Sequence, residues 1–129
     1  MSGVVRSWRT SMPVEQAVAA VERALQEQRF LVLWQLDVNA KLQEKGEHLQ
    51  APYRILEVCN APTARQALET NPEIGYFLPC KVVVYGEGGQ TVVGLVRPQV
   101  LLGLLGDERV GPLAEEVERR LVAALQLAV

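Results

Sequence analysis

The chain has 129 residues, of which 49% are hydrophobic and 22% charged, and its formal net charge is −2. This balance excludes a disordered chain and indicates one folded domain over residues 1–129. Basic residues are not clustered, so we expect no nucleic-acid partner. The first residues lack the apolar core of a signal peptide, and no apolar run approaches the roughly 18 residues of a membrane span. We therefore expect a cytoplasmic protein without a membrane partner. The charged residues are mostly Glu and Arg, a composition that fits a thermostable protein.

The first half of the chain predicts a strand, a helix, a second strand and a short helix. Residues 4–10 alternate apolar and polar side chains, as a half-exposed strand does. Pro13 stands where a helix begins, and residues 14–29 then carry one apolar stripe at helical spacing. Residues 30–37 are nearly all apolar at first and predict a central strand, and residues 38–45 predict a short helix.

The second half of the chain predicts three further strands and three further helices. In chain order, the expected elements are a strand at 53–60, a helix at 62–68, strands at 77–85 and 91–97, a short helix at 101–105 and a long helix from Gly111. The glycine-rich residues 86–89 predict a hairpin turn between the last two strands. The order β-α-β-(α)-β-α-β-β-(α)-α groups the helices against one sheet, which predicts the α+β class.

Four ordered segments of this sequence resemble the family called domain of unknown function 302. The segments are DVNAKLQEKG (37–46), YRILEVCNAP (53–62), ALETNPEIGYFLPCKVVVYGEGG (67–89) and VRP (96–98). The resemblance implies a single curved antiparallel sheet of about five strands packed against helices, related to the TATA-binding-protein-like class. It also implies a homodimer, and it transfers no biochemical activity. Family members often have Asp-Pro where this chain has Arg97-Pro98, so a role for an acid there does not carry over.

The two cysteines, Cys59 and Cys80, lie in strands that we expect to be neighbours. In that arrangement the thiols come close together near the strand ends, beside Glu57 and Lys81. One hypothesis is a redox pair or a soft-metal site. The alternative is that both cysteines behave as small buried hydrophobic residues, which their apolar neighbours favour. Their spacing matches neither a redox nor a zinc motif, so we expect no metal and no cofactor.

Four charged or polar residues near strand ends are further candidates. Glu57 and Lys81 interrupt apolar strands, and we expect them either to pair across strands or, in a pocket, to make Glu57 an acid or base. Asp37 and Asn39 follow the second strand, where they either cap the short helix or contact a ligand. The single histidine, His48, lies in a polar loop without partners at ligand spacing.

These patterns leave two main hypotheses for function. The first is a non-enzymatic, homodimeric module that binds a small, partly apolar ligand or a partner protein on its sheet. The second is a thiol-dependent redox or metal-linked protein that uses Cys59 and Cys80. No catalytic motif is complete, so we assign no catalytic residue, and an enzyme acting through Asp37, Glu57 and Lys81 is a weaker third idea. In each case we expect a pocket between the sheet and the helices.

Overall fold

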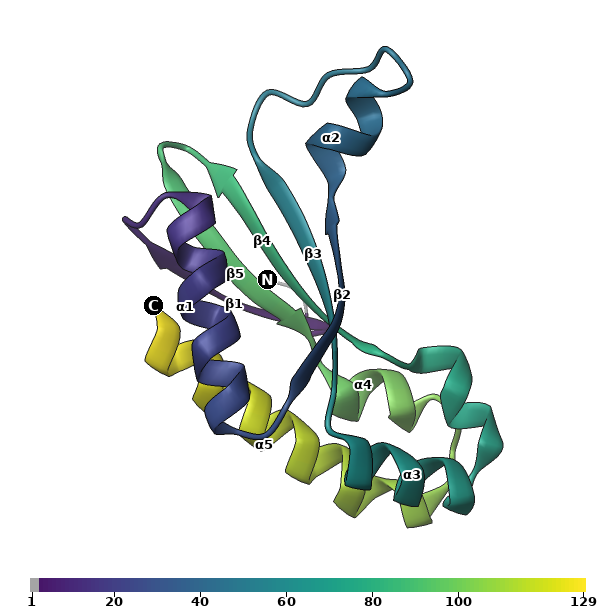
Figure 1. Cartoon of the computed structure of the whole chain (residues 1–129). Coiled ribbons are helices and arrows are strands. Elements are labelled where there is room, and N and C mark those ends of the chain that lie inside the picture. Colours follow the sequence, from purple (N-terminus) through teal and green to yellow (C-terminus); the bar gives the residue numbers. More distant parts are fainter. Residues whose placement is uncertain (1–2) are drawn as a thin grey trace.

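The computed structural model describes residues 3–129, and its strands and α-helices follow the predicted order (Figure 1). The elements are β1 (Val5–Thr10), α1 (Val14–Glu27), β2 (Leu31–Asp37), α2 (Val38–Gln43), β3 (Tyr53–Cys59), α3 (Ala61–Thr70), the 3-10 helix η1 (Pro72–Phe77), β4 (Cys80–Glu87), β5 (Gln90–Val96), α4 (Pro98–Gly103), the 3-10 helix η2 (Glu108–Val110) and α5 (Gly111–Ala128). Residues 1 and 2, where the expected domain begins, lie outside the described part. Within residues 3–129, we find no helix with both the length and the apolar character that crossing a membrane requires.

Five strands form a single antiparallel sheet in the order β1-β5-β4-β3-β2, and the sheet does not close on itself. The predicted neighbouring placement of β3 and β4 is therefore confirmed. The prediction of a central strand over residues 30–37 is wrong, because β2 lies at an edge of the sheet with its apolar side chains Leu31, Leu33 and Trp34 exposed. Gly88 and Gly89 make the turn between β4 and β5 with φ values of 61° and 79°. Two consecutive positive φ values are what a tight two-residue hairpin needs, and glycine adopts them without a steric penalty. The predicted α+β class with an antiparallel sheet is confirmed.

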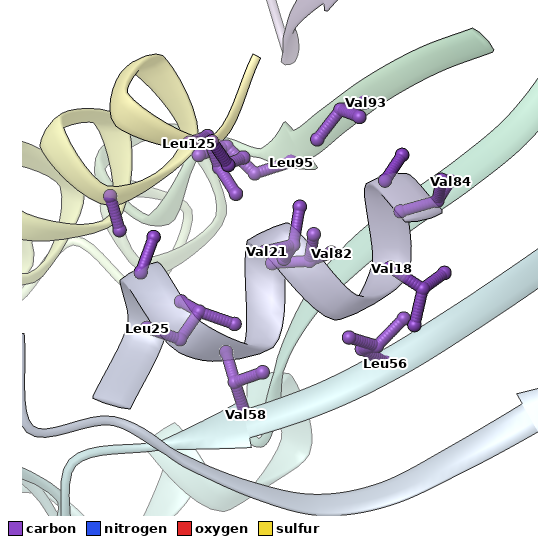
Figure 2. Packing of buried hydrophobic residues seen from close by; sticks show 14 of the residues in the cluster. Val18, Val21, Leu25, Leu56, Val58, Val82, Val84, Val93, Leu95 and Leu125 are labelled. Carbon is purple, nitrogen blue, oxygen red and sulfur yellow. The ribbon is translucent and has the colours of Figure 1, made fainter. Parts of the chain in front are cut away.

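Helices α1 and α5 cover one face of this sheet and build the main core with it (Figures 1 and 2). The strand side chains in this core alternate along β3, β4 and β5, as the two-residue period requires. They are Leu56, Val58, Val82, Val84, Val93 and Leu95. Residues spaced three and four positions apart along the two helices pack against these strand side chains. They include Val18, Val21 and Leu25 of α1 and Leu121 and Leu125 of α5. The opposite face of the sheet, which we call the open face, carries the residues between these.

A second, smaller core lies beside the end of the sheet. It is built by α3, η1, α4, η2 and the first turns of α5, and its buried members are Ala67, Ile74, Leu102, Val110 and Ala114. Helix α5 contributes residues to both cores, so it joins them. The two cores meet where β3 ends and β4 begins, which is the region of the two cysteines.

The prediction of one strand over residues 77–85 is wrong at its beginning. Residues Pro72–Phe77 form η1, and β4 starts only at Cys80. Pro79 has no N–H to donate to a strand ladder, so pairing begins after it. The short helix expected at 101–105 also begins earlier, at Pro98, because proline suits the first turn of a helix.

Candidate functional site

Most of the candidate residues lie at the sheet end where the two cores meet. In the register of β3 and β4, Val58 is opposite Cys80 and Glu57 is opposite Lys81. Cys80 lies on the helix-covered face and packs against the main core. Cys59 points the other way by strand alternation, but it is the last residue of β3, and both cysteines border one cavity. The structure therefore brings the two thiols to a common region.

This cavity, which we call the inner cavity, lies between the sheet end and the helices and has a volume of about 40 Å³. Its walls come from β3, β4 and four helical segments, α3, η1, α4 and α5. They are almost entirely apolar and include Phe30, Ala67 and Leu102 besides the cysteines. A pocket between sheet and helices was expected, and the inner cavity has that position.

The electrostatic setting of the thiols does not activate them. Burial raises the pKa of Cys80 to about 11, and the nearby Cys59 adds to the rise. Burial also raises the pKa of Cys59. A reactive cysteine needs a lowered pKa, because the thiolate is the nucleophile and the metal ligand. Moreover, residues 3–129 contain no group of three or more His, Cys, Asp or Glu side chains placed to hold a metal ion. The two thiols share one region, but their raised pKa values argue against the thiol-dependent hypothesis.

We expect the Cys80 thiol to make the stability of the protein fall at alkaline pH. The pKa of Cys80 in the folded state lies above the ordinary thiol value of 9.0, so this contribution is complete below pH 9 and is lost as the pH rises toward 11. Between about pH 8 and about pH 10.5, the wild type should lose about 2 kcal/mol more unfolding free energy than Cys80→Ala. Urea unfolding of both proteins across this range measures the difference. A difference that stays constant with pH would contradict the assignment.

Glu57 and Lys81 form an ion pair on the open face, with 2.7 Å between Glu57 Oε1 and Lys81 Nζ. The Glu57 side chain is 20% exposed and the Lys81 side chain 51%, so water screens the pair in part. A cross-strand pair of this kind contributes about 0.2–1 kcal/mol. Glu57 has its countercharge beside it. This arrangement is the cross-strand pair, and not the alternative of an acid or base in a pocket.

Asp37 and Asn39 both have structural partners. The Asp37 carboxylate accepts a hydrogen bond from the Ala40 N–H at 3.1 Å and caps α2. It also lies 3.5 Å from Arg54 Nε. The Asn39 side chain accepts from the Tyr53 N–H at 2.7 Å and donates to the carbonyl oxygens of Leu49 and Ala51. These bonds hold the loop between α2 and β3, at a distance along the sheet from the cysteines. The structure does not bring these two residues to the inner cavity.

Two buried polar residues were missed by the sequence analysis, Asn60 in the wall of the inner cavity and Glu118 on α5. Asn60 is 7% exposed; its side chain accepts from the Thr63 N–H at the start of α3 and donates to the Arg29 carbonyl. Glu118 is 5% exposed and accepts from the Arg97 side chain and the Gln99 N–H. An asparagine three residues before Thr63 is a recognisable N-cap signal. Glu118 stands on the inward stripe of α5, which marks it as a buried charge that needs a partner.

Two wider hollows lie elsewhere on the surface, of about 300 Å³ beside α4 and η2 and of about 430 Å³ beside α5. One acid of the first, Asp107, is held by hydrogen bonds from Arg109 and Asn71, which lower its pKa to about 2. One acid of the second, Glu118, is held by Arg97 and Gln99. The other acids that line these hollows, Glu108 and Glu115, are exposed, so among the described residues neither hollow holds a buried carboxylate without a partner.

Comparisons with known proteins agree with this fold along its whole length. A profile of the family described as "Domain of unknown function DUF302" matches residues 6–128. The chain is also similar to the crystal structure of an uncharacterized conserved DUF302 protein from Bacillus stearothermophilus. The two are 38% identical, the match covers 99% of this chain and 100% of that chain, and the TM-score is 0.95. No curated protein matches the chain.

Proposed function

Since the chain belongs to the DUF302 family, whose name assigns no activity, we propose from its geometry that it is a homodimeric binding module. The observation that carries the proposal is the open face of the sheet. This face is largely apolar apart from two ion pairs, and within residues 3–129 no helix packs on it as α1 and α5 pack on the other face (Figure 1). An antiparallel sheet can leave one face in water when that face is polar, but an apolar face is expected to find a partner.

The apolar surface continues from the open face to the edge strand β2. On the open face, Tyr53 and Tyr85 stack with their ring centroids 5.1 Å apart, and Ile55 is opposite Val83 in the register. On β2, the exposed fraction is 55% for Leu31, 54% for Leu33 and 53% for Trp34. Large side chains exposed to this extent, together on one strand beside a bare sheet face, are typical of an interface.

The charges around this surface favour a second copy of the chain as the partner. Two ion pairs lie on this face, Glu57 with Lys81 and Arg9 with Glu87. Each pair contains one acid and one base, so a copy related by a two-fold axis meets both signs and no net repulsion. Because the charges of these pairs balance, this surface has no excess charge that would attract a strongly charged partner. The surface is therefore complementary to itself.

The size of the face sets the expected strength of the dimer. Five strands about 4.8 Å apart and about 20 Å long present a projected surface of roughly 400–500 Å². Two such faces cover about 800–1,000 Å², below the about 1,600 Å² of a standard interface. We therefore expect a dimer that dissociates in the micromolar range.

Sedimentation equilibrium or multi-angle light scattering tests this proposal. We expect the mass to rise toward twice that of the chain between about 1 µM and about 100 µM. Trp34→Lys should shift the protein to the monomer, because it puts a charge into the contact, and its effect on folding should be small at a site already exposed. Leu127→Lys, at a leucine that is 68% exposed on α5, is the matched control and should still dimerise. A wild-type monomer at about 100 µM, or equal dimerisation of the two variants, would remove the proposal.

A further inference from the structure

Three adjoining cavities run from the cysteines to the surface of the protein. The inner cavity shares Leu78, Cys80, Pro98 and Leu102 with a middle cavity of about 10 Å³. The middle cavity shares Leu78 and Val96 with an outer cavity of about 160 Å³, which opens beside Tyr76 and Lys81. Leu78 borders all three, so its side chain stands between the inner cavity and the outside.

The inner end of this path favours an apolar occupant over water. A buried water needs two to four polar partners. The wall contains two polar side chains besides the thiols, Asn60 and Thr63. Asn60 already donates to the Arg29 carbonyl at 3.0 Å and accepts from the Thr63 N–H at 3.1 Å, which leaves the Thr63 hydroxyl as one partner where a water needs at least two. The two thiols are weak hydrogen-bonding groups, and burial keeps them protonated. Hydrocarbon therefore suits this space better than water does.

The outer end of the path presents a positive charge. Among the described residues that line the three cavities, Lys81 is the one charged side chain. Its ammonium carries three N–H donors, and Glu57 accepts at 2.7 Å. The Lys81 side chain is 51% exposed, so its other donors can reach a second acceptor at the mouth of the outer cavity.

We propose that these cavities form a binding site for an aliphatic carboxylate, with its alkyl chain directed toward Cys59 and Cys80 and its head group at Lys81. Leu78 must change rotamer to admit the chain. Lys81 also lies on the open face, but the inner cavity that would hold the alkyl chain lies on the helix side of the sheet end. The dependence of binding on chain length therefore tests this site, and the mass of the protein without ligand tests the dimer.

The alkyl tail and the carboxylate head of such a ligand contribute unequally to the binding affinity. Each methylene taken out of water raises the affinity about fourfold. An exposed ion pair contributes much less, so the carboxylate should bind about two- to fivefold more tightly than an amine with the same tail. Chain length therefore decides whether the ligand binds, and the head group decides its orientation.

Calorimetric titration of the protein with butanoate, hexanoate, octanoate and decanoate tests the inference. We expect the affinity to rise about fourfold per methylene and to level off when the chain fills the inner cavity. Nonylamine, which has the same alkyl tail as decanoate, should bind more weakly than decanoate, and Lys81→Met should abolish that preference while leaving the dependence on chain length. A lack of binding by every chain, or a nonylamine affinity equal to that of decanoate in the wild type, would overturn the proposal.

Substitutions that fill the inner cavity show whether the alkyl chain binds inside it or adsorbs to the protein surface. Ala67 is 6% exposed on α3 and lines the inner cavity, so Ala67→Leu should stop the gain in affinity at a shorter chain. Ala64→Leu, at a half-buried position of the same wall, makes the same test if Ala67→Leu does not fold. Ala123→Leu on α5, beside a different hollow, is the matched control and should bind like the wild type. The proposal is wrong if the α3 variants keep the full dependence on chain length.

Discussion

Replacing Leu25 with alanine is expected to lower the free energy of unfolding by about 3–5 kcal/mol. Leu25 is 0% exposed and lies on the stripe of α1 that packs against the sheet and α5 (Figure 2). Truncation removes apolar contacts on several sides and leaves a cavity that a close-packed core cannot refill. Urea unfolding followed by circular dichroism measures the loss. The variant and the wild type should be compared at one protein concentration, because dimerisation would also add to the measured stability.

The control for this prediction is Leu127→Ala on α5. Leu127 is 68% exposed, so its truncation should change the stability by less than about 0.5 kcal/mol. If Leu25→Ala and Leu127→Ala cost the same, the core does not lie between α1 and the sheet as the structure has it. The comparison therefore tests the face assignment of the helices, on which the identification of the open face depends.

The periodic elements could be predicted from the sequence because their signals are local. The apolar stripe of residues 14–29 and the alternation in residues 53–60 each depend on neighbours within a few positions. The hairpin at Gly88 and Gly89 follows from the two glycines themselves. The beginning of β4 was missed because the apolar run from Phe77 continues the strand pattern, while Pro79 interrupts the ladder.

The candidate site was harder to predict because its walls come from distant segments. The prediction that the thiols come close together did not foresee that Cys59 and Cys80 point to opposite faces, although both border the inner cavity at the strand ends. The walls of that cavity also include residues of α3, α4 and α5, and no local sequence pattern predicts where these helices lie. Asn39 shows the same limit, since its partner Tyr53 is fourteen positions away, beyond a loop. Periodicity assigns a side chain to one face of its own strand or helix, but it does not predict which residues of another segment pack on that face.

Replacing Glu118 with alanine is expected to lower the free energy of unfolding by about 2–4 kcal/mol. The Glu118 side chain is 6% exposed and receives a hydrogen bond from Arg97 Nε at 3.0 Å and from the Gln99 N–H at 3.1 Å. Its removal leaves the partly buried Arg97 guanidinium without its acid and the first turn of α4 without an acceptor. Urea unfolding again measures the change, and Glu116→Ala, at an exposed ion pair on the same helix, is the control, with an expected change below about 1 kcal/mol.

A double-mutant cycle identifies the cause of this loss. If the cost is that of an unpaired charge, Arg97→Met together with Glu118→Met should recover much of the stability that Glu118→Met alone removes. Additive effects would show that the two side chains are not coupled. Arg97→Asp should cost at least as much as Glu118→Ala, because it brings two carboxylates together at a buried site. The aspartate that the family resemblance suggests at this position is thus incompatible with Glu118. Arg97 and Glu118 form one ion pair that joins the end of β5 to α5, and each residue depends on the other.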